Sequence, residues 1–253
     1  MSFVTVQGHR IEVEEVAATR PGAPTLIFLH EGLGSVALWR DFPARLAAAT
    51  GAAAVVYSRY GYGKSAPIAN PHATDYMHKE ALEALPELRE KLGIRNPILI
   101  GHSDGASIAL IHAGSGRWPV RALVLEAPHV FVEDVTIASI EAAKETYRTT
   151  DLRARLGRYH ADPDNAFWGW NDIWLHPDFR RWNIEGVLPG VRCPVLAIQG
   201  ADDEYGTLAQ IDAVKCGVRG PFERLVLPNC KHSPHRDQEA ATLAAMSAFI
   251  ARV

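Results

Sequence analysis

The sequence has no hydrophobic run long enough to span a lipid bilayer. Its apolar stretches, such as residues 25–29 and 98–100, are far shorter than the roughly 20 residues that a membrane-spanning helix needs. The N-terminal residues also lack a long apolar stretch behind a basic leader. We therefore expect neither membrane insertion nor a secretory signal.

Excess positive charge and a cysteine framework are absent as well. The 253 residues include 26 Lys and Arg against 29 Asp and Glu, a formal net charge of −3, with no basic stripe. Nucleic acid is therefore not an expected partner. The 3 cysteines, Cys193, Cys216 and Cys230, are odd in number and scattered. This pattern is not a disulfide framework, and it favours a reducing, cytoplasmic location.

Short apolar runs alternate with longer amphipathic segments along most of the chain. After a β-hairpin over residues 3–18, the pattern predicts strands at residues 25–29, 53–57, 97–100, 121–125, 194–198 and 222–227. Helices are predicted at residues 38–49, 75–92, 106–113, 207–214 and 238–252, and Pro86 is expected to kink or split the second of them. The strand runs are apolar throughout, as in strands buried on both faces. The sequence thus predicts an α/β fold with a mostly parallel, eight-stranded sheet and helices on both faces.

Residues 128–190 break this alternation. They contain no clear strand and hold four of the 6 tryptophans, Trp168, Trp170, Trp174 and Trp182. Helical patches are expected at residues 135–147 and 152–159. We expect a core formed by residues 1–127 and 191–253, with residues 128–190 as a helical insertion over one edge of the sheet. Most of the tryptophans are expected to pack this insertion onto the core.

Residues 97–106 carry the most informative motif. A predicted strand leads into Gly101-His102-Ser103-Asp104-Gly105, and a predicted helix follows. A Gly-x-Ser-x-Gly motif between a strand and a helix is typical of a sharp turn that exposes its serine above the sheet. The turn also places the backbone N–H of Asp104 at a helix N-terminus, where it can stabilise an oxyanion. The side chains of His102 and Asp104 are expected to point away from Ser103.

At this point the chain resembles the α/β-hydrolase superfamily. Besides the nucleophile turn, residues 30–35 (His-Glu-Gly-Leu-Gly-Ser) resemble the family's oxyanion loop, and residues 59–65 resemble its Arg-Gly-x-Gly-x-Ser loop. Residues 199–203 and 230–235 resemble the acid and histidine loops, in the family's order Ser, Asp, His. The resemblance implies an α/β-hydrolase fold, in which a helical cap roofs the active site and supplies one or two aromatic side chains to it.

The oxyanion loop departs from the family pattern at Glu31, where a glycine is usual. The second oxyanion donor is expected to be the N–H of Gly32, with Leu33 as the alternative. Because a carboxylate near an oxyanion is unfavourable, Glu31 is expected to point away or to pair with a cation.

The remaining catalytic residues follow the last two predicted strands. The family pattern Gly-x-x-Asp selects Asp203 as the acid that orients the histidine, with Asp202 and Glu126 as alternatives. His232 is expected to be the general base that activates Ser103. His235 is the less favoured alternative. Together His232 and His235 could hold a metal, but no further ligands are evident, so neither a metal nor another cofactor is expected.

A serine nucleophile favours acyl chemistry. The leading hypothesis is hydrolysis of a small-molecule ester or thioester through an acyl-enzyme. Alternatives on the same residues are a carbon–carbon bond hydrolase or an acyltransferase, and a different class is a slow-turnover ligand-binding receptor on this fold. The expected partner is a small acyl substrate, and the sequence does not indicate an oligomeric state.

Overall fold

Eight strands form a single sheet in the computed structural model, which describes residues 2–253. The strands are β1 (Ser2–Val6), β2 (His9–Val16), β3 (Thr25–Leu29), β4 (Ala53–Tyr57), β5 (Ile98–His102), β6 (Ala122–Glu126), β7 (Val195–Gly200) and β8 (Phe222–Leu227). Their order in the sheet is β1-β2-β4-β3-β5-β6-β7-β8. Strand β2 pairs antiparallel with both β1 and β4, and all other neighbours pair parallel. The predicted fold class and sheet are confirmed.

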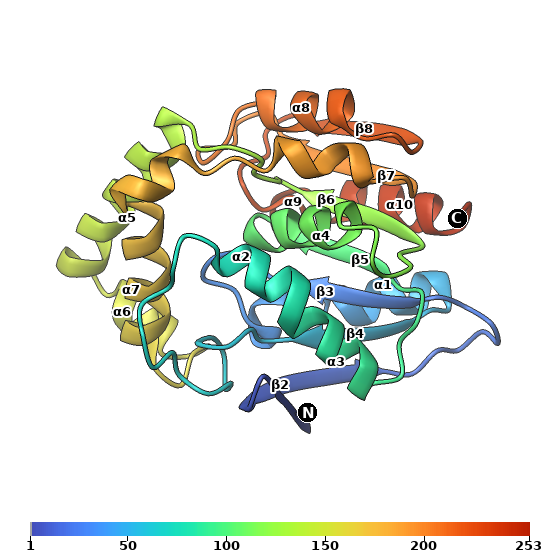
Figure 1. Cartoon of the computed structure of the whole chain (residues 1–253), viewed down its shortest axis with the longest axis horizontal. Coiled ribbons are helices and arrows are strands. Elements are labelled where there is room, and N and C mark those ends of the chain that lie inside the picture. Colours follow the sequence, from blue (N-terminus) through green and yellow to red (C-terminus); the bar gives the residue numbers. More distant parts are fainter. Residues whose placement is uncertain (1) are drawn as a thin grey trace.

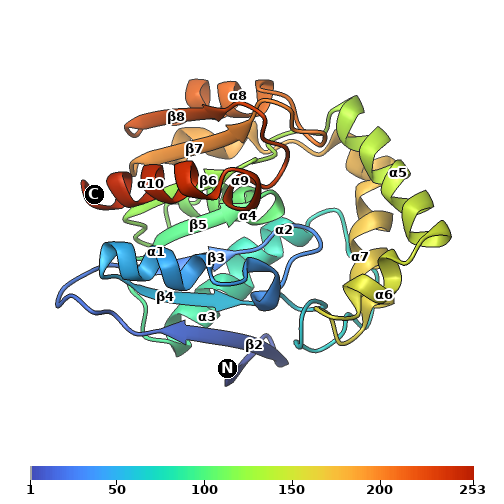
Figure 2. The same ribbon diagram turned by 180° about the vertical axis from the view of Figure 1, so that it is seen from behind.

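Helices cover both faces of this sheet. They are α1 (Phe42–Thr50), α2 (Tyr76–Lys79), α3 (Leu85–Lys91), α4 (Asp104–Gly114), α5 (Asp134–Thr149), α6 (Leu152–Leu156), α7 (Pro163–Trp174), α8 (Ala209–Gly217), α9 (Pro234–Asp237) and α10 (Glu239–Ile250). Figures 1 and 2 show α1, α9 and α10 on one face and α2, α3, α4 and α8 on the other. Within residues 2–253, no helix is both long and apolar enough to cross a membrane.

The two faces explain why the central strands are apolar throughout. Successive side chains of a strand point to opposite faces. In β3, Leu26 and Phe28 therefore join the core under α1 and α10, whereas Ile27 and Leu29 join the core under α4. All four side chains are fully buried. A strand that is buried on both faces therefore lacks the alternation of polar and apolar residues seen in half-exposed strands. The two cores hold the sheet in place, and with it the loops that follow each strand.

Two predicted helices are interrupted. In place of the predicted helix over residues 38–49, the structure has a 3₁₀ turn at Val36–Trp39 followed by α1. The two are separate because Arg40, between them, adopts a left-handed φ of 54°. The predicted helix 75–92 divides into α2, a π-helical turn at Glu80–Ala84 and α3. Pro86 lacks a donor N–H and its ring would clash with the carbonyl four residues earlier, so the chain widens into a π turn just before it.

The segment between β6 and β7 contains α5, α6 and α7, followed by 3₁₀ turns at Pro177–Arg181 and Glu185–Gly190. We call residues 134–174 the α5–α7 segment. Both views place it to one side of the sheet, away from the helices on either face (Figures 1 and 2). The exact division of the chain at residues 127/128 and 190/191 stays a prediction.

Candidate active site

Ser103 occupies a strained turn between β5 and α4. Its φ is 53° and its ψ is −117°, in a region that side-chain-bearing residues rarely adopt. The flanking glycines make the turn possible. A Cβ added at Gly101 would lie 2.4 Å from the carbonyl oxygen of Gly105, and one at Gly105 would lie 2.0 Å from the carbonyl oxygen of Leu29. Only glycine fits at either position, and the turn therefore holds Ser103 at the end of the strand.

Ser103, His232 and Asp203 form one chain of hydrogen bonds. The Ser103 hydroxyl lies 2.9 Å from His232 Nε2, and His232 Nδ1 lies 2.8 Å from Asp203 Oδ1. A carboxylate only accepts, so Nδ1 carries the proton and donates to Asp203. Nε2 is then the acceptor for the serine hydroxyl. The three residues come from loops 29 to 129 positions apart in the chain, and the sheet brings together all three that the sequence singled out.

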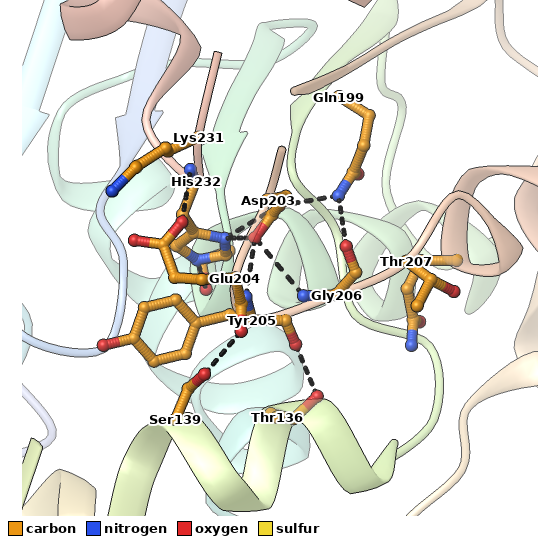
Figure 3. A network of polar contacts seen from close by, with 12 residues as sticks. Thr136, Ser139, Gln199, Asp203, Glu204, Tyr205, Gly206, Thr207, Lys231 and His232 are labelled. Atoms are coloured by element: carbon orange, nitrogen blue, oxygen red, sulfur yellow. Dashed lines mark hydrogen bonds and ion pairs between the residues drawn. The ribbon is translucent and has the colours of Figure 1, made fainter. Parts of the chain in front are cut away.

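Asp203 is fixed by several donors besides His232 (Figure 3). Its Oδ2 accepts a hydrogen bond of 2.6 Å from Gln199 Nε2, and its Oδ1 accepts from the backbone N–H groups of Tyr205 and Gly206. Burial raises the pKa of Asp203, but the hydrogen bond and charge of His232, followed by the Tyr205 N–H, outweigh burial and leave this pKa below its usual value. Asp203 is therefore an anion near neutral pH.

The alternative acids, Asp202 and Glu126, and the alternative base, His235, make other contacts. Asp202 is exposed, and its N–H donates to the carbonyl of Cys230. Glu126, at the end of β6, accepts from His235 through both the backbone N–H and Nδ1, each at 2.9 Å. This second carboxylate–histidine pair is buried, and Ser103 contacts it only through the backbone, where the Ser103 N–H donates to the Glu126 carbonyl at 2.9 Å. The structure thus pairs His232 with Asp203 and pairs His235 with Glu126.

The two expected oxyanion donors line the same cavity as Ser103. Asp104 is the first residue of α4, a helix of 11 residues, so its N–H is one of the unpaired donors of a helix N-terminus. Gly32 lies in the loop after β3, beneath Trp170. A Cβ at Gly32 would come within 2.2 Å of the Trp170 indole. Among residues 2–253, neither N–H donates to a protein acceptor.

The cavity above Ser103 is small, and aromatic side chains form part of its wall. Its volume is about 120 Å³, and its walls include Trp170 and Trp174 from α7, Tyr205 from the acid loop, and Ile140 from α5. Trp168 and Trp182 are not among its lining residues and pack with Phe167 and Phe179 instead. Two of the four tryptophans thus face the cavity and two pack elsewhere. The sequence alone could not separate these pairs.

A larger cavity of about 300 Å³ lies between the β1–β2 hairpin, α2 and the loop at residues 60–73, and Ser103 does not line it. Some of its polar groups have partners, whereas the buried Arg59 Nε, Tyr62 hydroxyl and His72 Nε2 have no hydrogen-bond partner among residues 2–253. Tyr57 donates to Glu80 at 3.0 Å, and Arg59 Nη2 lies 3.6 Å from Asp104 Oδ2. We therefore place the candidate active site in the smaller cavity, which contains the serine.

Arg59 and His30 have structural roles that the sequence did not reveal. The N–H of Arg59 donates to His30 Nε2 at 3.0 Å, so His30 Nδ1 carries the proton and donates to the carbonyl of Glu31. Arg59 Nη2 donates to that same carbonyl at 2.8 Å. The Arg59 loop thereby fixes the backbone of the oxyanion loop. Burial, then Arg59, lowers the pKa of His30 well below its usual value, so the ring is neutral.

Asp104 uses its side chain as well as its backbone. Tyr76 donates to Oδ2 at 2.7 Å, and the indole N–H of Trp174 donates to Oδ1 at 3.3 Å. The residue after Ser103 therefore connects α2 and α7. Among residues 2–253, no cluster of three or more His, Cys, Asp or Glu side chains is arranged to hold a metal ion.

Comparisons with known proteins give one family. Residues 26–245 match the model of the alpha/beta hydrolase family. The human protein "Serine hydrolase BPHL" is 23% identical over 196 residues, which cover 72% of this chain and 63% of the human protein. A "2-succinyl-6-hydroxy-2,4-cyclohexadiene-1-carboxylate synthase" of Enterobacter sp. (strain 638) is 23% identical over 92% of this chain and 94% of its own length.

A solved structure agrees in fold. The enol-lactonase from Burkholderia xenovorans LB400 superimposes with a TM-score of 0.77 at 15% identity, over 99% of this chain and 100% of that one. At this identity the likeness concerns the fold alone. The family match, in contrast, spans most of the sequence. The chain therefore belongs to the α/β hydrolase family of enzymes.

Proposed function

We propose that this protein hydrolyses a small-molecule ester or thioester through an acyl-enzyme on Ser103. The observation that carries the proposal is the continuous hydrogen-bond chain Ser103–His232–Asp203, with distances of 2.9 and 2.8 Å. A free serine hydroxyl is a poor nucleophile, and a neutral imidazole within hydrogen-bond reach can take its proton. The likeness to a protein named a serine hydrolase supports this proposal.

In the first half-reaction, Ser103 Oγ attacks the acyl carbonyl carbon while His232 Nε2 takes its proton. The carbonyl oxygen becomes an oxyanion, which the N–H groups of Gly32 and Asp104 stabilise. Asp203 stabilises the imidazolium of His232 and keeps its orientation. When the intermediate collapses, the alkoxide or thiolate leaves with the proton from His232.

In the second half-reaction, water attacks the acyl-enzyme and His232 takes a proton from it. Collapse of the second intermediate returns this proton to Ser103 Oγ and releases the carboxylic acid. Every step uses side chains and N–H groups of this chain, so we propose no cofactor. The aromatic walls of the cavity shield the oxyanion from bulk water, which strengthens its hydrogen bonds.

The size of the cavity suggests a short acyl group. A volume of about 120 Å³ accommodates only a few carbon atoms beyond the carbonyl, unless the α5–α7 segment moves. We therefore expect acetyl to butyryl esters to be better substrates than long-chain esters. The partner class is a small acyl compound.

The test is labelling with a fluorophosphonate probe, in which the serine oxygen displaces fluoride from phosphorus. Wild type should label, and Ser103→Ala and His232→Ala should not, although both remain folded by circular dichroism. His176→Ala, at an exposed site, serves as a control. Labelling with steady turnover of short aryl esters supports the hydrolase. Labelling without turnover would favour a receptor, and a folded wild type that does not label would overturn the proposal.

A further inference from the structure

Glu31 occupies the oxyanion loop with its backbone already fixed. Its carbonyl accepts hydrogen bonds from His30 at 2.6 Å, from Arg59 at 2.8 Å and from the N–H of Gly34 at 3.1 Å. The absence of a Cβ at Gly34 leaves room for the side chain, because a Cβ there would lie 2.3 Å from Glu31 Oε2. The carboxylate is 23% exposed and borders the active-site cavity.

His102, the residue before the nucleophile, links this carboxylate to the general base. Its side chain is only 1% exposed, and Nδ1 lies 3.5 Å from Glu31 Oε2. Its other nitrogen, Nε2, lies 2.7 Å from the backbone carbonyl oxygen of His232. A carbonyl and a carboxylate can only accept. Nε2 therefore donates to the carbonyl, and Nδ1 faces the carboxylate at ion-pair distance without forming a hydrogen bond. A proton on Nδ1 replaces the repulsion between its lone pair and the carboxylate with attraction, which favours a doubly protonated, positively charged imidazole.

The charged and titratable groups around His102 support this protonation state. They are Glu31 from the oxyanion loop, Glu126 from the end of β6, and the rings of His129, His232 and His235. Burial alone lowers the pKa of His102, but the polar contact with Glu31 and its charge, then Glu126 and the His232 carbonyl, raise it to about 9. Although burial raises the pKa of Glu31, His102 holds that pKa well below its usual range.

We propose that Glu31 and His102 form an ion pair that positions His232, with His102 donating to the backbone carbonyl of that residue. The inference rests on the proposed function, because it assigns the pair a role toward the general base. Neither side chain touches the reacting atoms, so both are positioning residues. The pair joins three loops that carry the oxyanion donor, the nucleophile and the base. It also neutralises the carboxylate beside the oxyanion site.

The state of His102 can be measured without any substrate. In wild type labelled with ¹⁵N-histidine, one imidazole should remain doubly protonated at pH 7.5 and titrate near pH 9, and its signals should vanish in His102→Gln. In Glu31→Gln the same ring should lose its second proton at least one pH unit lower. A His102 ring that is neutral at pH 7.5 in wild type would overturn the proposal, whatever the enzyme's activity.

Kinetics then test the positioning role. Glu31→Gln should lower kcat for a short aryl ester by about 10- to 100-fold with KM changed less than threefold, since small misplacement of a catalytic group has effects of this size. Glu14→Gln, on an exposed position of β2, is the matched control. His102→Gln retains a donor for the His232 carbonyl and should keep more activity than His102→Leu.

The wild-type fluorophosphonate reaction separates the two possible failures. If wild type does not label, the proposed function fails. If wild type labels and turns over but Glu31→Gln retains the wild-type kcat, only the positioning role fails. Equal activity of His102→Gln and His102→Leu would likewise exclude a role for the donated hydrogen bond.

Discussion

Two carboxylate–histidine pairs lie close together in this molecule and differ in one respect. His232 Nδ1 is 2.8 Å from Asp203, and His235 Nδ1 is 2.9 Å from Glu126. The other ring nitrogen of His232 meets Ser103, and the side chain is 13% exposed. The His235 side chain is 4% exposed and packs against Trp39, with ring centroids 4.6 Å apart. The acid–imidazole contact is the same. What differs is the access of the second ring nitrogen to a serine hydroxyl and a cavity.

The largest expected effect is the difference in kcat between variants in which Asp203 or Glu126 is neutralised. Asp203→Asn should lower kcat by about 10⁴-fold without unfolding the protein, because an amide favours the wrong tautomer of the histidine. Glu126→Gln should change kcat by less than about tenfold. Ester turnover of the two purified variants tests this contrast. A larger loss in Glu126→Gln than in Asp203→Asn would reverse the two assignments.

The buried Glu126–His235 pair should contribute strongly to stability. Glu126→Ala removes the partner of a buried histidine and should lower the free energy of unfolding by about 3–5 kcal/mol. Urea denaturation monitored by circular dichroism measures this change. An exposed carboxylate, as in Asp202→Ala, should change stability by less than about 0.5 kcal/mol. A stability of Glu126→Ala equal to wild type would contradict the structural role of this pair.

Histidines without a carboxylate partner should make the protein sensitive to acid. Burial lowers the pKa of His72 and His112 to about 4 and that of His129 to about 3. In the unfolded chain these rings bind protons near pH 6.5, so the unfolded state gains protons first and stability falls as pH falls. We expect the free energy of unfolding to be about 3 kcal/mol lower at pH 5.5 than at pH 7.

Urea unfolding at both pH values checks this expectation. His129→Gln should reduce the difference between them by about 1 kcal/mol, whereas His176→Gln, at an exposed position, should leave it unchanged. Equal stability at pH 5.5 and pH 7 would mean that these rings are not held neutral.

The smallest of these effects concerns the cavity that distinguishes His232 from His235. Gly32→Ala places a Cβ against the Trp170 indole and should lower kcat/KM by about 10- to 30-fold, because the indole must shift. Gly186→Ala, which meets open space, is the control. Adding Trp170→Ala to Gly32→Ala should recover part of the loss. No recovery would point to a direct effect on the Gly32 N–H.

Much of the fold could be predicted from the sequence, since strands with two buried faces leave a clear apolar pattern. The resemblance of the loops around Ser103, Asp203 and His232 to those of the α/β-hydrolase superfamily also predicted that these residues would meet. The sequence predicted that Glu31 would point away or pair with a cation, but it did not identify His102 as the partner, nor Glu126 as the partner of His235. These contacts depend on side chains brought together by the sheet rather than on a local pattern. Likewise, Arg40 carries no signal for its left-handed conformation, which divides the predicted helix 38–49.

The hydrogen bond between Trp174 and Asp104 has an optical consequence. Trp174 is 1% exposed, donates from its indole N–H to the buried carboxylate of Asp104 and lies beside the His129 ring. Its surroundings therefore differ from those of a solvated tryptophan. Displacement of α7 would break this contact and bring water to the ring. The difference between the emission spectra of wild type and Trp174→Phe thus isolates the signal of one residue in the cavity wall beside Ser103, and a change in that signal during a reaction would report a displacement of α7.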